Sequence, residues 1–239
     1  KELWAPELHI IDDKCYIYVA CDDGNNSNHR MYVLYNDSAD PQAPYKLKGK
    51  IFDRTDKWAI DGTVLQYGGK LYFAWSGWEG DTNTMQNIYI AEMSDPFTIC
   101  SDRVLISTPQ LDWELKGANG TLHHPYINEG PVFLQRNEKL YLIYSASGSW
   151  CNDYCLGRLD FLGGDILKPE NWVKEKTCQF ARTENIKGPG HCSFFEKDGV
   201  TFMAYHAFHE DEKYGWGSAD ARVQPIKWEN DLPVLGIPE

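Results

Sequence analysis

The chain has 239 residues, a mass of 27.4 kDa and a formal net charge of −12 at pH 7, which argues against a nucleic acid or an anionic membrane as its partner. Its composition, 42% hydrophobic and 24% charged with 20 Gly and 12 Pro, excludes a disordered or fibrous chain. The 9 Trp, 14 Tyr and 10 Phe favour β-strands and surfaces that stack on flat apolar ligands, and the net charge does not exclude a neutral ligand such as a carbohydrate.

One phrase recurs along the chain: an apolar strand end, a polar turn, and then a strand in which aromatic and β-branched residues alternate. It occurs at 10–21 (IIDDKCYIYVAC), 65–77, 134–148 and 195–208. This pattern predicts a β-hairpin in each place. The turn markers Lys14, Lys70, Lys139 and Val200 are 56, 69 and 61 residues apart.

A further strand is predicted after each hairpin, at 29–37, 87–96, 155–161 and 221–228. The unit is therefore three or four antiparallel strands in ~60 residues, a repeat size typical of β-propeller blades. A β-sandwich is the alternative for an all-β chain, but it does not predict one hairpin phrase at similar spacings. The prediction is an all-β fold, with residues 1–239 forming a single β-propeller domain of about four blades.

The start of each repeat is where functional residues are expected, because the innermost strand of a propeller blade runs beside the central channel. These starts lie at 4–10, 60–66, 128–134 and 190–196. Counting nine residues back from the markers gives Ala5, Asp61, Gly130 and His191, with Glu129 one residue out of register. Asp61 and Glu129 are each followed by Gly, which is expected to permit a sharp corner that aims the acid at the channel.

A turn-forming acid or a structural His is the simpler explanation for any one of these residues. Three repeats that each deliver an ionisable group to one channel mouth favour a functional site instead. Carboxyl groups in unlike environments can divide acid and base roles at one pH. Paired carboxyl groups among aromatic side chains suit the hydrolysis of glycosides.

Several segments together resemble glycoside hydrolase family 43, whose members are five-bladed β-propellers. They are WAPE, DGTVLQYGGKLYFAWSGWEG, NEGP, GPGHCSF and ARVQ, and they cover nearly all of the chain in the family's order. FAWSGWEG and DRVLISTP are most similar to exo-acting α-L-arabinofuranosidases. The resemblance implies an inverting hydrolase that removes terminal α-L-arabinofuranosyl groups from plant cell-wall arabinan or arabinoxylan. A β-xylosidase, an endo-arabinanase and a sugar-binding propeller without catalysis are the alternatives.

The resemblance also implies a role for each matching residue. Glu129 matches the general acid, and Asp61 matches the acid that raises the pKa of the general acid through its nearby like charge. Trp4, Trp75 and Arg222 are the expected sugar-binding residues. His191 matches a residue that in relatives contacts a hydrated metal ion, so a structural calcium ion near His191 is implied, although no cofactor is required for the reaction.

One catalytic group of the family has no counterpart here. The family's general base is an Asp of the first blade, upstream of WAPE, and Asp40 and Asp95 follow outer strands instead. Inversion needs this base to activate a water held between two carboxyl groups about 6.5–9.5 Å apart. Three explanations account for the missing base. The chain could be a fragment of a longer enzyme, or a degenerate member that binds sugar without cleaving it. Alternatively, the missing blade could be supplied by another polypeptide or by a second copy. Weak or absent hydrolysis is expected of this chain.

The seven Cys residues show no zinc-binding spacing. Cys151 and Cys155 lie in one loop and could form a disulfide, whereas the others are expected to be small buried apolar residues. Cys192 stands after His191, where relatives more often carry a polar residue. No apolar run approaches the length of a membrane span and no signal segment opens the chain, so a secreted and a cytoplasmic location both stay open.

Overall fold

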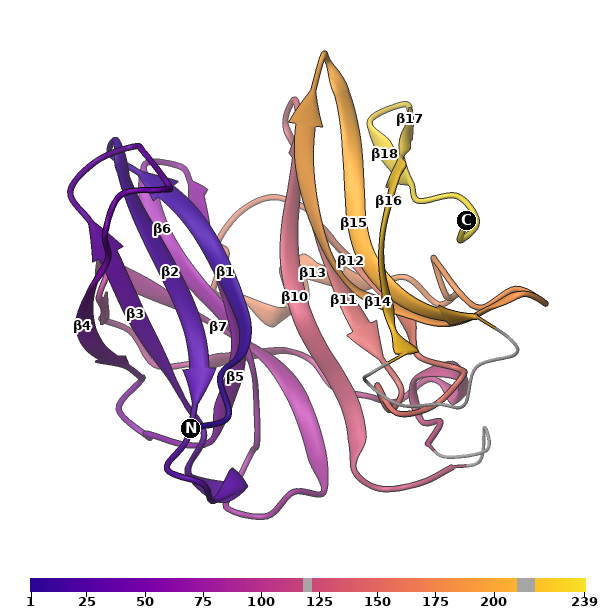
Figure 1. Ribbon diagram of the computed structural model, residues 1–239, viewed down its shortest axis with the longest axis horizontal. Coiled ribbons are helices and arrows are strands. Elements are labelled where there is room, and N and C mark those ends of the chain that lie inside the picture. The colour runs from indigo at the N-terminus through magenta and orange to yellow at the C-terminus, as the bar shows by residue number, and fades with distance from the viewer. Residues whose placement is uncertain (118–121, 210–217) are drawn as a thin grey trace.

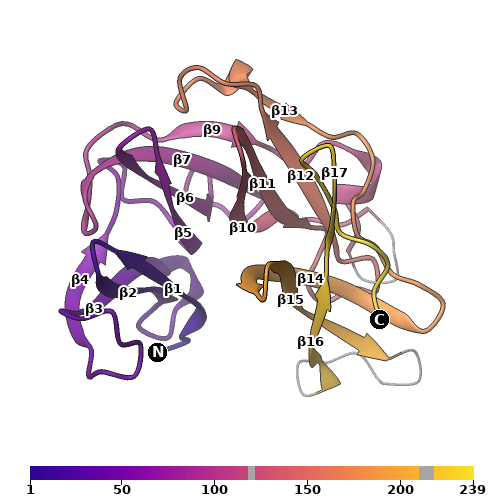
Figure 2. The ribbon, with the colours of Figure 1, turned by 90° about the horizontal axis from the view of Figure 1, so that it is seen from above.

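The computed structural model describes residues 1–117, 122–209 and 218–239. Its strands form four blades of antiparallel strands that follow one another in chain order around a common axis (Figures 1 and 2). A short parallel pairing, Tyr126 with Met85 and Ile127 with Gln86, joins the second blade to the third in one continuous sheet. The helices within the described ranges are single 3-10 turns, and none of them is long and apolar enough to cross a membrane. The predicted β-propeller with four blades in this chain is confirmed.

Each blade is a meander of adjacent strands. The first contains β1 (Trp4–Ile11), β2 (Lys14–Cys21), β3 (Arg30–Asn36) and β4 (Lys46–Ile51). The second contains β5 (Ala59–Tyr67), β6 (Lys70–Gly77) and β7 (Met85–Asp95), with β8 (Thr98–Ile99) and β9 (Val104–Ser107) paired to β7. The third contains β10 (Tyr126–Arg136), β11 (Lys139–Ala146), β12 (Cys155–Phe161) and β13 (Trp172–Lys174). The fourth contains β14 (Ile186–Lys197), β15 (Val200–His209) and β16 (Asp220–Pro225), followed by the pair β17 (Lys227–Glu229) and β18 (Leu232–Val234).

The turns between the first two strands of each blade are where the sequence places them. The β1–β2 turn is Asp12-Asp13, with φ angles of 49° and 58°, and the β5–β6 turn is Gly68-Gly69, with 58° and 76°. Two left-handed residues are what a two-residue hairpin turn needs to match the strand twist. The four predicted hairpins are therefore confirmed, whereas the short outer strands β4, β9 and β13 were not located from the sequence.

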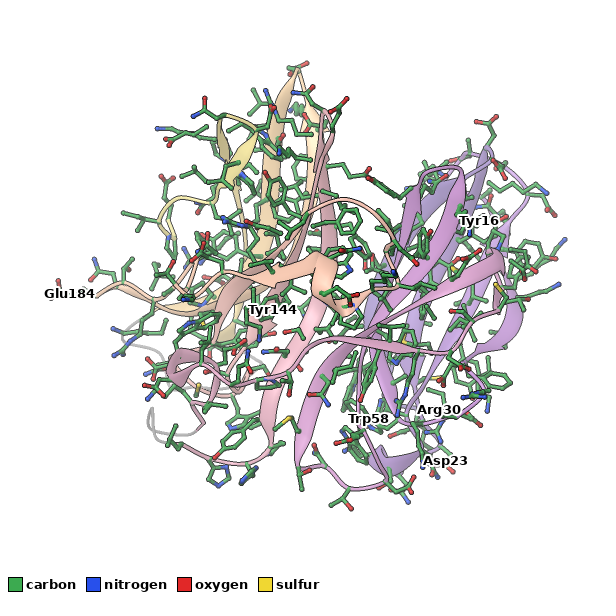
Figure 3. The ribbon with its side chains drawn as sticks, turned by 180° about the vertical axis from the view of Figure 1, so that it is seen from behind. Tyr16, Asp23, Arg30, Trp58, Tyr144 and Glu184 are labelled. Atoms are coloured by element: carbon green, nitrogen blue, oxygen red, sulfur yellow. The ribbon has the colours of Figure 1, made fainter. Side chains whose placement is uncertain are left out.

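Apolar side chains fill the space between neighbouring blades (Figure 3). Tyr16 and Tyr18 of β2 lie in the cluster that joins the first two blades, together with Trp58. Tyr144 of β11 lies in the cluster between the second and third blades, and Tyr205 of β15 in that between the third and fourth. The alternation of side chains along these strands supplies one apolar face to each interface.

All four innermost strands carry a β-bulge at the same place. The pairing register shifts between Trp4 and Glu7 in β1, Ile60 and Thr63 in β5, Glu129 and Val132 in β10, and Gly190 and Ser193 in β14. The left-handed residues within these bulges are Ala5, Asp61, Gly130 and His191, with φ angles of 41°, 57°, 54° and 48°. A bulge bends the strand and re-aims a side chain, so equivalent positions of four blades are turned in the same way.

The role of glycine at these corners differs between the two acids. In β10, Gly130 is itself left-handed, as expected. In β5 the left-handed residue is Asp61, and Gly62 serves a different purpose, because a Cβ atom there would lie 2.2 Å from Cζ of Phe73. Gly62 is therefore needed for close packing against Phe73, and the expectation that it forms the corner was wrong.

Candidate active site

A cavity of about 150 Å³ lies where the four innermost strands meet. Its lining residues are Ala5, Pro6 and Glu7 of β1, Asp61 of β5, Gly130 and Pro131 of β10, and His191, Cys192 and Ser193 of β14. All four left-handed bulge residues are among them. Positions nine residues before each hairpin marker, namely Ala5, Asp61, Gly130 and His191, thus meet at one shared cavity.

Asp61 is buried and links the second blade to the third. Its Oδ2 accepts a hydrogen bond of 3.0 Å from the backbone N–H of Gly130. Burial raises the pKa of Asp61, while the charge of His191, the Gly130 N–H and the charge of His29 act in the opposite direction. Because these favourable partners surround Asp61, it is the acid of this cavity best placed to carry a negative charge.

Glu129 is also buried, and its Oε1 accepts a hydrogen bond of 2.8 Å from the hydroxyl of Tyr154. Burial, followed by the charge of Asp61, raises the pKa of Glu129 to about 8, although the hydrogen bond from Tyr154 opposes this. The carboxyl group of Glu129 is therefore neutral at pH 7 and carries a proton that it can donate. No pattern in the sequence pointed to Tyr154, which precedes β12 in an irregular loop.

His191 packs its ring over the bulge of β10. Its backbone N–H donates to Oγ of Ser145, 2.8 Å away, and a Cβ atom on Gly130 would lie 3.3 Å from the ring. Burial and the charge of His191 lower the pKa of His206 to about 4. The His206 ring stacks on Tyr154 with a centroid distance of 5.5 Å, so aromatic groups close the site behind Glu129.

Glu7 is a third acid of the site and lines the cavity together with Asp61, but the sequence analysis did not identify it. Its Oε1 accepts a hydrogen bond of 3.1 Å from the hydroxyl of Thr63. Burial raises the pKa of Glu7 to about 8; the Thr63 bond opposes this rise and the charge of Asp61 adds to it. The available signal was the alternation of β1 after its bulge, in which Glu7 and His9 share one face.

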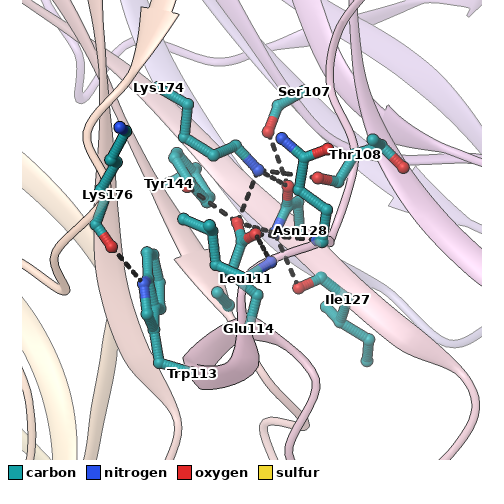
Figure 4. A network of polar contacts seen from close by, with 12 residues as sticks. Ser107, Thr108, Leu111, Trp113, Glu114, Ile127, Asn128, Tyr144, Lys174 and Lys176 are labelled. Atoms are coloured by element: carbon teal, nitrogen blue, oxygen red, sulfur yellow. Dashed lines mark hydrogen bonds and ion pairs between the residues drawn. The ribbon is translucent and has the colours of Figure 1, made fainter.

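Behind Glu129, a buried polar network holds the preceding residue in place (Figure 4). Asn128 donates from Nδ2 to Oε1 of Glu114 over 3.0 Å, and its Oδ1 accepts from Ser107 and Lys174 at 2.6 and 3.2 Å. Glu114 Oε1 also accepts from Nζ of Lys174 at 2.6 Å and from the hydroxyl of Tyr144 at 2.9 Å. Because Asn128 and Glu129 point to opposite faces of β10, this network fixes the strand from the side away from the cavity.

The three expected sugar-binding residues lie in different surroundings. Trp4 precedes Ala5 at the cavity, and its partly exposed indole stacks on the buried His29 with a centroid distance of 3.9 Å. Trp75 is only 3% exposed and packs between Phe73 and Tyr89 in the core. The structure therefore does not present Trp75 to a ligand, because its strand, β6, directs the side chain into the interface between the first two blades.

Arg222 is also not among the residues that line the cavity. Its Nη1 donates to the backbone carbonyl of Glu239 over 2.6 Å, and its Nη2 lies 3.6 Å from Asp220. Arg222 pairs across strands with Tyr205, whose ring contributes to the core between the third and fourth blades. The structure thus brings together Asp61, Glu129 and His191 and places Trp4 next to Ala5 of the cavity lining, while Arg222 lies on β16 with contacts to Glu239 and Asp220.

The donor set offers little for a directly bound calcium ion. Within the described ranges, no three or more His, Cys, Asp or Glu side chains are arranged to hold a metal ion. Calcium takes six to eight oxygen ligands, whereas His191 offers nitrogen. These residues alone do not form a calcium site, so an ion near His191 would have to be held through water ligands.

All seven cysteines are free thiols, including Cys151 and Cys155. Cys192 lines the cavity and is buried, and burial raises the pKa of its thiol, so that it is a neutral group at pH 7. The site therefore combines Asp61, whose negative charge acts on its two neighbours, with two acids favoured as neutral groups at pH 7: Glu7 in the cavity lining and Glu129 beside Asp61. Such a set can donate a proton to a leaving oxygen and bind hydroxyl groups.

Known proteins resemble the chain along its whole length. The sequence profile of Glycosyl hydrolases family 43 matches residues 1–233. An extracellular exo-α-(1→5)-L-arabinofuranosidase of Streptomyces chartreusis is 33% identical, with 89% of this chain and 65% of that protein covered. The α-L-arabinofuranosidase 43 of Humicola insolens is 34% identical, with 99% of this chain and 50% of that protein covered.

A solved structure is similar as well. That of α-L-arabinofuranosidase from Lactobacillus brevis has a TM-score of 0.87 and 33% identity, with 99% of this chain and 76% of that chain covered. A thermostable family-43 glycoside hydrolase has a TM-score of 0.80 and 25% identity, with 98% and 74% covered. The chain spans between half and two thirds of the length of the curated relatives named above.

Proposed function

The chain belongs to glycosyl hydrolases family 43, and on this premise we propose that its cavity binds the terminal α-L-arabinofuranosyl group of an arabinan-type polysaccharide. The names of the relatives support this substrate, since they include an exo-α-(1→5)-L-arabinofuranosidase. The single observation that carries the proposal is the neutral acid Glu129 beside Asp61, which lines a cavity of about 150 Å³ together with Gly130, the residue after Glu129. A compact cavity suits an exo-acting protein, which encloses only the end of a polysaccharide.

Glu129 is proposed as the general acid that protonates the glycosidic oxygen. Its pKa of about 8 keeps the proton in place at neutral pH, where a Glu in water would have lost it. Asp61 is proposed as the residue that maintains this state, because its negative charge disfavours a second charge on Glu129. The Gly130 N–H that binds Asp61 belongs to the residue next to Glu129, so both acids are held by one bulge.

The general base is the part of the inverting mechanism for which we propose no residue of this chain. Glu7 is the remaining acid of the cavity lining, and its pKa of about 8 makes it a poor proton acceptor at neutral pH. At a pH high enough to ionise Glu7, Glu129 would lose its proton as well. Weak hydrolysis by this chain follows, and the relatives' full activity is not assigned to it.

Hydrolysis and binding are tested together with α-1,5-linked arabinotriose and an aryl α-L-arabinofuranoside. We expect the chain to bind arabinotriose in calorimetry and to release arabinose slowly. Glu129→Gln should abolish the slow release from arabinotriose, whose leaving group needs a proton, and reduce release from the activated aryl substrate much less. Equal losses on both substrates would contradict the general-acid role.

A sugar-binding propeller without catalysis is the second candidate, and the protonated state of Glu7 favours it. It predicts that arabinotriose binds with no arabinose released above the rate of the Glu129→Gln variant. Rapid turnover by the 239-residue chain would exclude a purely sugar-binding function. It would also contradict our proposal that the chain supplies no general base.

A further inference from the structure

Glu7 lines the cavity and has no role in the proposed chemistry. One of its oxygens, Oε1, is occupied by the hydrogen bond from Thr63. Within the described part of the chain no hydrogen bond reaches Oε2, and 26% of the side chain is exposed. The second oxygen is therefore available to a molecule in the cavity.

The groups that face Glu7 provide no positive charge to stabilise a carboxylate. On β1, Nε2 of His9 lies 3.7 Å from Oε1, but this nitrogen accepts the N–H of Val64, and burial lowers the pKa of His9 to about 4. From β14, the neighbouring Cys192 is a neutral thiol, and His191 acts on Asp61. From β5, Asp61 adds negative charge. The neutral carboxylic acid is thus the favoured form of Glu7 at pH 7.

We propose that Glu7 is a sugar-specificity residue, which donates a hydrogen bond from its neutral carboxylic acid to a hydroxyl group of the terminal sugar. This inference rests on the proposed function, since it requires a sugar in the cavity. A carboxylic acid that stays neutral at pH 7 in an apolar site is a strong hydrogen-bond donor. The competing explanation is that Glu7 only joins β1 to β5 through its contact with Thr63.

The two explanations predict different responses to pH. The neutral acid is present below about pH 8 and is lost as the pH rises through that value. The carboxylate that replaces it can only accept hydrogen bonds, so the donor to the sugar disappears. A Gln at position 7 retains an oxygen for Thr63 and supplies N–H donors at every pH. A purely structural contact is not expected to make sugar affinity depend on pH in this range.

The experiment uses calorimetry with arabinotriose at about pH 6.5 and pH 9. The background variant is Glu129→Gln, which leaves the ligand uncleaved and removes the other acid with a pKa of about 8. In this background we expect affinity to fall about tenfold at the higher pH, because tenfold corresponds to about 1.4 kcal/mol, the size of one hydrogen bond. Adding Glu7→Gln should limit the fall to about twofold. Thermal unfolding confirms that each variant is folded at both pH values.

Thr63→Val is the matched control, because it removes the contact with Thr63 and leaves the acid of Glu7 in place. In the Glu129→Gln background, Thr63→Val should still lose sugar affinity as the pH rises. The pH at which half of the affinity is lost should be higher, because the Thr63 hydrogen bond lowers the pKa of Glu7. The same pH dependence with Glu7 and with Gln at position 7 would overturn the inference. Absence of arabinotriose binding at both pH values would instead overturn the proposed function, and this inference with it.

Discussion

At the scale of single residues, Asp61 is the centre of the site. Its negative charge acts on two glutamates, Glu129 and Glu7, which both have a pKa of about 8. Burial is the larger cause in each case, so Asp61 adds to an effect that the cavity already produces. One carboxylate thereby helps to keep two neighbouring acids protonated.

Asp61→Asn is expected to lower the pKa of Glu129 by on the order of one unit, because the negative charge is removed while burial remains. Asn tolerates the left-handed backbone at this position and keeps an oxygen for the N–H of Gly130. Carbon-13 NMR of the Glu side-chain carboxyl groups measures the change, with the Glu129 signal assigned by its loss in Glu129→Gln. Any activity on arabinofuranosides should also be lost at a lower pH as the pH rises.

Asp12→Asn is the control for this prediction. Asp12 is an exposed, left-handed turn residue at the far end of β1, so the same chemical change is made in a similar backbone. A shift of the Glu129 pKa that is no larger in Asp61→Asn than in Asp12→Asn would contradict the role of Asp61.

Residues of the site could be predicted from the sequence where they occupy equivalent positions in the repeats. Asp61, Gly130 and His191 lie at equal distances from their hairpin turns, and equal distances become equal places in a propeller. Tyr154 contacts Glu129 from an irregular loop, where neither spacing nor alternation applies. Trp75 lies in the core between the first two blades, and the pattern of β6 could not predict this, because it does not tell which side of the blade faces the neighbouring sheet.

At the scale of elements, the structural feature that recurs in every blade is the β-bulge of its innermost strand. It places one left-handed residue at the cavity in every blade, and two of these four residues, Asp61 and His191, carry ionisable side chains. A left-handed residue other than glycine costs about 1–2 kcal/mol, so the bulge geometry is maintained against a local preference. Bulges could not be predicted here, because only Gly130 marks one with a residue suited to that conformation.

Ala5→Gly tests the strain in the bulge of β1. Glycine adopts the left-handed conformation freely, so Ala5→Gly removes backbone strain from the folded state. This gain should offset the loss of stability caused by the greater flexibility of glycine in the unfolded chain. We expect a free energy of unfolding that is unchanged or higher by roughly 1 kcal/mol. Ala204→Gly in the regularly paired part of β15 should lower it by about 0.5–1 kcal/mol. Urea unfolding measures both, and equal losses would show that Ala5 is not strained.

The second element-scale feature is the ion pair of Glu114 and Lys174, which joins the turn before β10 to β13. Glu114 is fully buried, so Lys174→Met would leave its carboxylate with neutral hydrogen-bond donors and without a positive charge beside it. We expect the free energy of unfolding to fall by about 3–5 kcal/mol. Removing both charges, as in Glu114→Gln with Lys174→Met, should recover part of this loss.

Lys176→Met is the matched control for Lys174→Met. Lys176 lies two residues further on, its side chain is exposed, and its backbone carbonyl accepts from Trp113, a contact that the substitution retains. Its effect should stay within about 0.5 kcal/mol. Equal effects of the two Lys variants in urea unfolding would show that the ion pair does not stabilise the strand that carries Glu129.

At the scale of the molecule, the repeat made the fold predictable. Hairpins of similar spacing identified four blades, and the structure places them in chain order around one axis (Figure 2). The outer strands could not be located as surely, because β4 and β13 are short or exposed and carry several charged residues, such as Lys46, Lys50 and Lys174. What the repeat did not specify is which faces of the first and last blades stay uncovered.

Those uncovered faces lead to a prediction about the whole molecule. On the first blade, Leu8 and Leu47 are exposed, and they lie on the face of the sheet opposite to Tyr16 and Tyr18, which pack against the second blade. On the last blade, Phe195 is exposed and stacks on Phe202, on the face opposite to Met203 and Tyr205. Their apolar surface is grouped on two sheets at the ends of the arc rather than scattered, and grouped apolar surface promotes association.

The chain is therefore expected to self-associate as its concentration rises. Sedimentation velocity should show a weight-average sedimentation coefficient that increases with concentration, and Leu8→Lys combined with Phe195→Lys should reduce this increase, because a charged side chain opposes apolar contact on either face. Leu162→Lys is the control, since Leu162 is an exposed leucine in the loop after β12 and belongs to neither face. A sedimentation coefficient independent of concentration, or an equal effect of Leu162→Lys, would show that these two faces do not drive association.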